Sequence, residues 1–170
     1  MKNTKIIVIA VIFSAVSVLF LKELFQALAA FIFSAKEMSF SAYLLGFNFY
    51  FEPNAANYKF VYILLYTAPV LYLLILVEIM SLMMKKSALG GTRYFLIISI
   101  LLHIGYLLIY IFYSSFLLIM APGSKNNFSV LSIYLGLNQT GRIIFAFFIV
   151  FAIVIYMQTA TRRLLKYINI

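Results

Sequence analysis

The stretch YFLIISILLHIGYLLIYIFYSSFLLIM, from Tyr94 to Met120, decides the fold of this protein. It contains no aspartate, glutamate, lysine or arginine, and His103 is its one ionisable side chain apart from the tyrosines. A helix needs ~20 apolar residues to cross the ~30 Å hydrocarbon core of a bilayer, and this stretch is longer than that. It therefore predicts a membrane-spanning helix.

Three further stretches have the same character, and they cover residues 6–30, 60–84 and 140–160. Hydrophobic residues make up 66% of the whole chain and charged residues only 10%. A water-soluble fold could not cover so much apolar surface with so few charges, so lipid must be the solvent for much of it. The sequence predicts an all-α integral membrane protein. Residues 1–170 form one domain, a bundle of four transmembrane helices at 6–30, 60–84, 94–120 and 140–160.

The first apolar stretch is interrupted by Lys22 and Glu23 and supports two interpretations. In one, it is a long helix whose first ~20 residues span the membrane, which puts Lys22 and Glu23 near the far interface. In the other it is a secretory signal peptide, since a basic start, an apolar core and Ala27-Leu28-Ala29 fit that pattern.

The distribution of basic residues predicts the orientation. With four spans, eight basic residues fall on the side of the two termini and four on the other side, leaving out Lys22. Cytoplasmic loops carry the excess of lysine and arginine. We therefore expect a multi-pass protein of the inner or plasma membrane with both termini in the cytoplasm. The residues expected to contact lipid headgroups there are Lys85, Lys86, Arg162, Arg163 and Lys166.

The two outer loops are expected to hold short amphipathic segments at the membrane interface. In the first, roughly residues 34–58, the spacing of Phe40, Tyr43, Leu44, Phe47 and Phe51 suits an amphipathic helix. The alternation of side chains over residues 47–51 suits a short extended segment equally well. Residues 128–137 of the second outer loop are also rich in apolar side chains and are expected to form a second interfacial segment.

Missing residue types exclude several classes of function. The chain has no cysteine and no aspartate, and its one histidine is His103. Disulfides, iron–sulfur clusters, paired-aspartate proteolysis and a zinc site needing two histidines are therefore excluded. The basic residues are scattered at the ends of apolar runs, which argues against nucleic acid as a partner. We expect no catalytic residues, no metal and no cofactor.

Glu78 and His103 are the candidate intramembrane polar pair. Ionisable groups in hydrocarbon cost at least ~2.5–3.5 kcal/mol, so they usually face the bundle interior and find partners. Counted from Lys85 and Arg93, their depths differ by about one helical turn on two adjacent antiparallel helices. The pair could relay protons, couple transport or clamp a quinone-like headgroup. Alternatively, it holds two helices together, or Glu78 extends toward the basic loop.

Tyr72, Tyr106 and Tyr110 are candidates for lining a cavity that binds a planar or amphipathic ligand. The alternative assigns most membrane tyrosines to the aromatic belt and to packing. Pro69 is expected to kink the second helix and to free a carbonyl near Leu65.

Three functions remain open on the sequence alone. The first is a non-catalytic accessory subunit of a larger membrane complex, with other membrane protein subunits and the lipid bilayer as partners. The second is a small homo-oligomeric transporter or channel that uses Glu78 and His103. The third is a membrane protein that binds or acts on a lipid or quinone.

Overall fold

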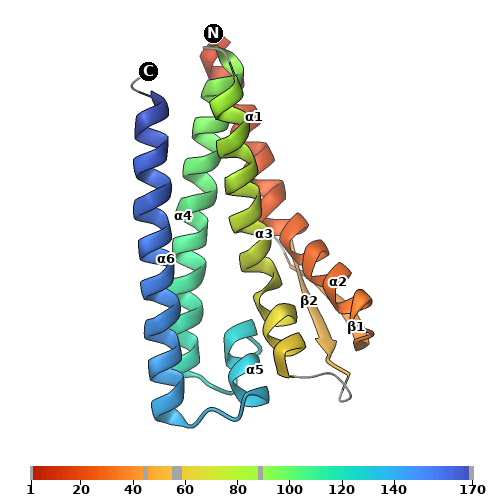
Figure 1. The fold of residues 1–170 in the computed structure, drawn as a ribbon. Coiled ribbons are helices and arrows are strands. Elements are labelled where there is room, and N and C mark those ends of the chain that lie inside the picture. Colours follow the sequence, from red (N-terminus) through yellow and green to blue (C-terminus); the bar gives the residue numbers. More distant parts are fainter. Residues whose placement is uncertain (1, 44–45, 55–58, 88–89, 169–170) are drawn as a thin grey trace.

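Four long helices lie side by side, and both chain termini are at the same end of the bundle (Figure 1). The computed structural model describes residues 2–43, 46–54, 59–87 and 90–168. We call the end that bears the termini the termini end. The opposite end carries a β-hairpin and a short helix, and we call it the hairpin end. The elements are α1 (Lys2–Val16), η1 (Ser17–Leu21), α2 (Lys22–Ile32), β1 (Lys36–Tyr43), β2 (Gly46–Glu52), α3 (Lys59–Lys86), α4 (Gly91–Met120), α5 (Asn127–Tyr134) and α6 (Gln139–Ile168).

The four predicted spans are present as helices that are long and apolar enough to cross a membrane. They are Thr4–Ile32, which runs through α1, η1 and α2, then Lys59–Lys86, Gly91–Met120 and Gln139–Tyr167. Each helix is three to eight residues longer than the span predicted from the sequence, because polar end residues such as Lys85 and Arg163 continue the helix beyond the apolar run. The chain is accordingly a multi-pass helical bundle.

A π-helical turn joins α1 and α2. Residues Ser17–Leu21 form η1, after which α2 begins at Lys22. A π turn takes one more residue than an α turn, and one residue is worth about 100° of rotation around the helix axis. The face that follows is therefore rotated, and Lys22, Glu23 and Gln26 of α2 are buried. Beyond η1, α2 leans away from α4 and α6 toward the hairpin end (Figure 1).

The first outer loop forms an antiparallel β-hairpin, so the amphipathic helix expected there is wrong. Ser39 pairs with Tyr50 and Ser41 with Asn48, and the register shifts between Lys36 and Ser39. The period-two alternation of residues 47–51 was the correct signal, because it places Phe49 on the face that packs against the helices. Phe49 is 5% exposed and packs with Ala30, Ala35 and Leu65. Leu44, one of the residues of the expected helix, lies outside the described residues.

The hairpin packs on the bundle through aromatic rings. The Phe51 ring stacks on Tyr66 of α3 with their centroids 5.0 Å apart, and Tyr66 in turn stacks on Tyr134 of α5. Tyr62 and Tyr66 are both buried and pack against other aromatic rings. Protein contacts therefore fix the hairpin and α5 to each other and to α3.

Local capping explains where α5 begins and ends. The Asn126 side chain accepts a hydrogen bond from the Phe128 N–H at the first turn. At the other end Gly136 adopts a φ of +67°, and Leu137 N–H donates to the Ser132 carbonyl. This is the left-handed glycine ending that stops many helices. The amphipathic segment expected over residues 128–137 is thus a short helix followed by a turn.

The bundle has a buried interior and an apolar exterior. Leu73 of α3, and Leu107 and Ile111 of α4, are fully buried at its centre. Large apolar side chains are exposed along the outer faces, among them Ile9 on α1 and Phe148 on α6. Lipid tails are the solvent that such faces require in a membrane-spanning bundle.

Candidate functional site

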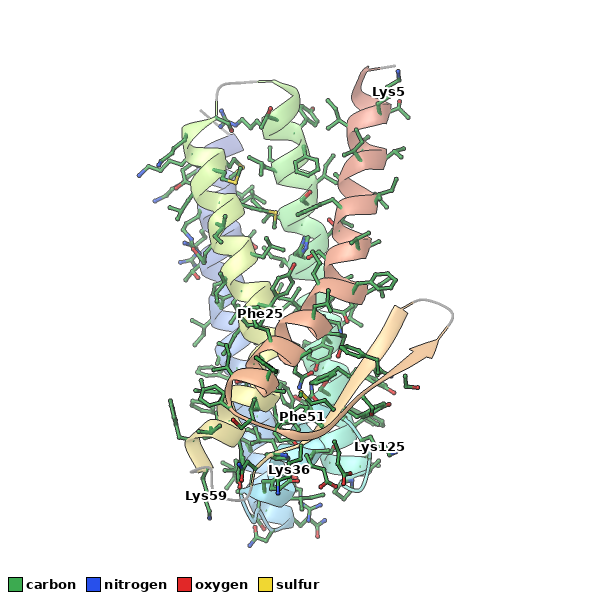
Figure 2. All side chains as sticks on the ribbon, turned by 90° about the vertical axis from the view of Figure 1, so that its right-hand side faces the viewer. Lys5, Phe25, Lys36, Phe51, Lys59 and Lys125 are labelled. Atoms are coloured by element: carbon green, nitrogen blue, oxygen red, sulfur yellow. The ribbon has the colours of Figure 1, made fainter. Side chains whose placement is uncertain are left out.

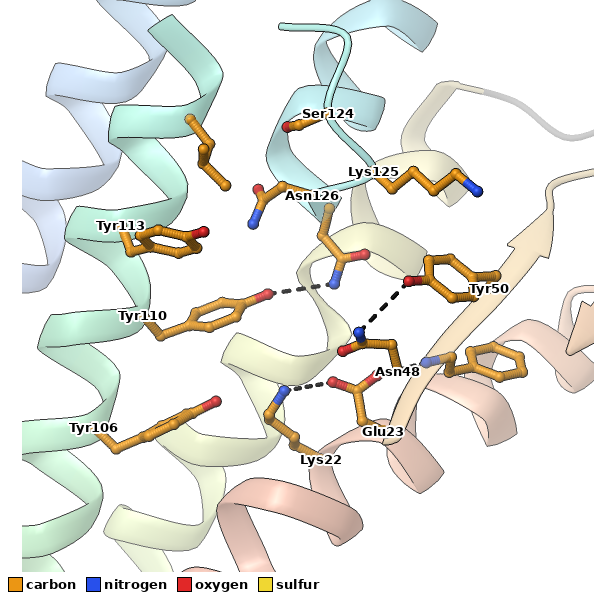
Figure 3. A pocket seen from close by; sticks show the side chains of 13 residues that line it. Lys22, Glu23, Asn48, Tyr50, Tyr106, Tyr110, Tyr113, Ser124, Lys125 and Asn126 are labelled. Carbon is orange, nitrogen blue, oxygen red and sulfur yellow. Dashed lines mark hydrogen bonds and ion pairs between the residues drawn. The ribbon is translucent and has the colours of Figure 1, made fainter. Parts of the chain in front are cut away.

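A buried ion pair lies at the start of α2. Lys22 Nζ contacts Glu23 Oε1, and each residue is only 5% exposed. The second carboxylate oxygen, Oε2, accepts a hydrogen bond of 3.2 Å from the Phe49 N–H of β2. Both oxygens of Glu23 are therefore engaged, one by the neighbouring ammonium and one by the hairpin backbone (Figure 3).

Two tyrosines of α4 surround the ammonium. Lys22 Nζ lies 5.9 Å from the ring centroid of Tyr106 and 5.3 Å from that of Tyr110. Within ~6 Å, the negative face of an aromatic ring attracts a cation. At 1.5 Å per residue, these tyrosines lie ~20–25 Å along α4 from Arg93, within the ~30 Å thickness of a bilayer core. The ion pair thus lies in the half of the bundle nearest the hairpin end.

Gln26 continues the polar cluster one turn further along α2. Its Nε2 donates to the Leu65 carbonyl at 3.2 Å, and its amide group pairs with the Asn127 amide at 3.2 and 3.3 Å. Asn127 Nδ2 also donates to the Tyr110 hydroxyl at 3.3 Å. Helices α2, α3, α4 and α5 therefore meet through hydrogen bonds of one buried glutamine and one asparagine.

The ion pair borders a pocket of about 410 Å³ between α4 and β2. Figure 3 shows Lys22 and Glu23 at its base, Tyr106, Tyr110 and Tyr113 on the α4 side, and Asn48 and Tyr50 on the β2 side. The segment that leads into α5 closes the remaining side. The lining residues are Lys22, Glu23, Asn48, Phe49, Tyr50, Tyr106, Tyr110, Tyr113, Leu117, Ser124, Lys125, Asn126 and Asn127. We call this the Lys22 pocket.

A second pocket of about 390 Å³ lies next to the first and shares Phe49, Tyr50, Lys125 and Asn127 with it. Its lining adds the carboxylates of Glu37 and Glu52. Lys125 lies over the Tyr50 ring, with Nζ 5.4 Å from the ring centroid. Both glutamates are exposed at the surface, unlike Glu23.

The structure gives Glu78 and His103 different partners and does not join them as a pair. Glu78 receives two hydrogen bonds from Arg163 of α6, at 2.6 and 2.8 Å, and a third from the Tyr156 hydroxyl at 2.9 Å. Its side chain is 37% exposed and that of Arg163 is 42% exposed. Glu78 therefore connects α3 to α6 near the termini end, and its partners are on α6 rather than on α4.

His103 is fully buried and forms hydrogen bonds through both ring nitrogens. Nδ1 lies 2.7 Å from the Ser99 carbonyl oxygen, and Nε2 lies 2.9 Å from Ser17 Oγ. Ser17 Oγ lies in turn 2.9 Å from the Tyr72 hydroxyl. A carbonyl can only accept, so Nδ1 carries a proton, and in the neutral ring Nε2 accepts from Ser17.

The tyrosines, Pro69 and the basic residues singled out in the sequence lie in different parts of the structure. Tyr106 and Tyr110 line the Lys22 pocket, whereas Tyr72 is bonded to Ser17 away from it. The Leu65 carbonyl, which has no helical donor because Pro69 lacks an N–H, accepts from Gln26. Of the residues expected at lipid headgroups, Arg163 binds Glu78. The others, Lys85, Lys86, Arg162 and Lys166, are exposed at the termini end.

The sequence alone did not identify Lys22 and Glu23 as a site, because the length of the first apolar run places them near the membrane interface. The signal in the sequence for a buried ion pair was the adjacency of Lys22 and Glu23 inside an apolar run. Burying a single unpaired charge there would cost far more free energy than burying the pair. Their burial depends on η1 and on the hairpin, neither of which the apolar pattern reveals. Among the described residues, no group of three or more histidine, aspartate and glutamate side chains could hold a metal ion.

Comparison with known proteins identifies no relative: no family model, no curated protein and no solved structure matches this chain.

Proposed function

We propose that this chain is a membrane protein that binds a small amphipathic molecule in the Lys22 pocket. The observation that carries the proposal is a 5%-exposed ion pair, Lys22 with Glu23, at the base of a pocket of about 410 Å³. The pocket is concave and places charged and amide groups beside aromatic rings, and polar groups of this kind fix the orientation of a ligand in a binding site.

The energetic cost of the ion pair supports a binding role. Removing a charge from water costs several kcal/mol per ion, and hydrophobic residues in place of a buried pair are often as stable or more so. A buried pair is therefore weak evidence for stability and stronger evidence for a site. Ionisable residues inside membrane-spanning segments mark ligand or ion sites by the same reasoning.

The orientation of the bundle completes the proposal. Figure 2 shows Lys5 at the termini end and Lys36, Lys59 and Lys125 at the hairpin end. Of the basic residues outside α2, eight belong to the termini side and four to the hairpin side. By the positive-inside rule, the termini end faces the cytoplasm and the pocket is reached from the outer side.

A variant with a filled pocket tests the proposal. Asn48 is exposed on β2 and lines the pocket, so Asn48→Trp places an indole in the cavity without replacing a core residue. The protein is purified in mild detergent, incubated with a total lipid and quinone extract of its own membrane, and analysed by native mass spectrometry. We expect the wild-type protein to retain a specific molecule and Asn48→Trp to retain about tenfold less.

Ser41→Trp is the matched control. Ser41 lies directly opposite Asn48 in the hairpin and is exposed, but it does not line the pocket. We expect this variant to retain the molecule as the wild type does, with the same melting temperature. A wild-type protein that carries only bulk lipid, in proportion to its abundance in the extract, would contradict the proposal.

A further inference from the structure

We infer that the Lys22 pocket selects an anionic oxygen group, a phosphate or carboxylate, carried by an apolar tail. The inference rests on the proposed function and specifies the ligand. It follows from which of the polar groups around the pocket are already engaged and which still have hydrogen-bonding capacity.

Both oxygens of the Glu23 carboxylate already have hydrogen-bond partners. Its Oε1 contacts Lys22 and its Oε2 accepts from the Phe49 N–H. A cationic ligand would have to compete with Lys22 for Glu23 in a buried position. Such competition would leave the ammonium itself buried and unpaired, which is the costly arrangement.

The ammonium, by contrast, has spare donors. A lysine ammonium carries three N–H donors. Within the described residues, that of Lys22 makes one hydrogen bond, to Glu23, and otherwise faces the rings of Tyr106 and Tyr110. Tyrosine rings attract the cation but do not accept its protons as oxygen atoms do. A ligand oxygen at the base of the pocket would therefore accept a charge-assisted hydrogen bond from Lys22.

The charges that line the pocket favour the same ligand. Besides the pair, Lys125 is the charged residue of the lining, and it is exposed at the opposite side of the pocket. The pair contributes no net charge, so the lining as a whole is positive. The side-chain nitrogens of Asn48 and Asn126 donate to the hydroxyls of Tyr50 and Ser114, and each keeps a second N–H that suits a phosphate or carboxylate oxygen.

The apolar tail follows from the position of the pocket. Lys22 lies at the level of Tyr106 and Tyr110, within the length of α4 that a bilayer core covers. Tyr113, 60% exposed on α4, and Leu117 extend the lining from Lys22 toward the hairpin end, which is the end from which a headgroup would enter. A headgroup bound at Lys22 could keep its chain in the hydrocarbon beside α4. A free anion would have to enter the same site from water.

Tryptophan fluorescence provides the test, because the chain has no tryptophan. Tyr113→Trp places a single reporter in the lining, and Tyr94→Trp places one at the termini end of the same helix as a control for changes in the micelle. The probes are phosphatidylglycerol and phosphatidylcholine of equal chain length, glycerol phosphate and inorganic phosphate. We expect a saturable change for phosphatidylglycerol with Tyr113→Trp, and a much weaker one for phosphatidylcholine.

The ion-pair variants make the test specific. In the Tyr113→Trp background, Lys22→Gln combined with Glu23→Gln removes the charge without leaving a lone buried ion, and affinity for phosphatidylglycerol should fall about tenfold or more. Lys22→Arg keeps a cation and should retain affinity within about threefold of the Tyr113→Trp parent. Melting temperatures of all variants establish that the protein is folded.

The outcomes separate this inference from the function on which it rests. The anionic selectivity is overturned if phosphatidylglycerol and phosphatidylcholine bind equally, or if the double substitution has no effect on binding. A binding pocket is still upheld in that case if Asn48→Trp retains less of the molecule than Ser41→Trp. Saturation by inorganic phosphate alone upholds the anionic group and overturns the apolar tail. No response to any probe, together with no retained molecule in the wild type, overturns both proposals.

Discussion

The side-chain amide of Gln26 donates a hydrogen bond of 3.2 Å to the Leu65 carbonyl, the group that Pro69 leaves without its helical donor. A proline at position i removes the N–H that would bond the carbonyl at i−4. In hydrocarbon, an unpaired carbonyl is costly because there is no water to satisfy it. One polar residue of α2 thus compensates for a backbone defect in α3 and fixes the two helices at the level of the pocket.

A double-mutant cycle tests this compensation. Gln26→Leu should destabilise the protein, because it leaves the Leu65 carbonyl without a donor and removes the two hydrogen bonds between Gln26 and Asn127. In a Pro69→Ala background the new Ala N–H can satisfy Leu65, so the same substitution should cost less. We expect a coupling free energy of about 0.6–1.7 kcal/mol, the range found for hydrogen bonds between membrane helices. Thermal unfolding in detergent measures it, and strictly additive effects would show that Gln26 does not compensate for Pro69.

The ion pair should behave as a unit in stability measurements. Lys22→Met alone leaves Glu23 charged and buried, and such losses cost about 3–5 kcal/mol. Lys22→Met combined with Glu23→Gln leaves no lone charge and keeps an acceptor for the Phe49 N–H, so it should be markedly more stable than the single variant. Unfolding curves of the wild type and the two variants decide this. A single variant as stable as the double one would mean that the pair is solvated.

His103 gives a direct prediction for nuclear magnetic resonance. Because it is the sole histidine, its ring nitrogens are assigned without ambiguity. The Ser99 carbonyl requires a proton on Nδ1, and Ser17 Oγ donates to Nε2 in the neutral ring. We expect nitrogen-15 spectra at neutral pH to show the neutral tautomer protonated on Nδ1. A proton on Nε2 instead would contradict the hydrogen-bond chain through Ser17 to Tyr72.

The contact between Glu78 and Arg163 should contribute little to stability despite its good geometry. Both side chains are more than a third exposed, so solvent and headgroups screen the pair. We expect a coupling of about 1 kcal/mol or less from a cycle with Glu78→Gln and Arg163→Gln. Glu78→Gln should also leave phosphatidylglycerol binding unchanged, since Glu78 does not line the Lys22 pocket. A loss of binding would place Glu78 in the site.

The apolar pattern predicted the positions of the four helices because their central residues are apolar, and it underestimated their lengths because polar end residues continue them. The sequence also predicted a freed carbonyl near Leu65, because Pro69 has no N–H to donate to the carbonyl four residues earlier. The pairing of Glu78 with His103 required knowing how each helix is rotated about its axis, and the count of residues gives only depth. The partner of Glu78 is Arg163, which its position after the fourth apolar run assigned to lipid headgroups.

The hairpin and the Lys22 pocket were harder to predict for a different reason. Aromatic residues near 40–51 fit both a helical and an alternating period, and contacts such as Phe51 with Tyr66 select between them. Burial of Lys22 and Glu23 depends on η1 and on β2, which are tertiary features. The accessory-subunit role and the transporter role stay predictions, which co-purification from the native membrane and flux measurements in vesicles would test.

A structure of the protein crystallised from a lipid mesophase containing phosphatidylglycerol tests the central claim most directly. We predict density for a bound anionic group within hydrogen-bond distance of Lys22 Nζ, between β2 and α4, with its chain in the hydrocarbon beside α4. A Lys22 pocket that is collapsed, or filled only with water while Lys22 and Glu23 remain paired, would contradict the account.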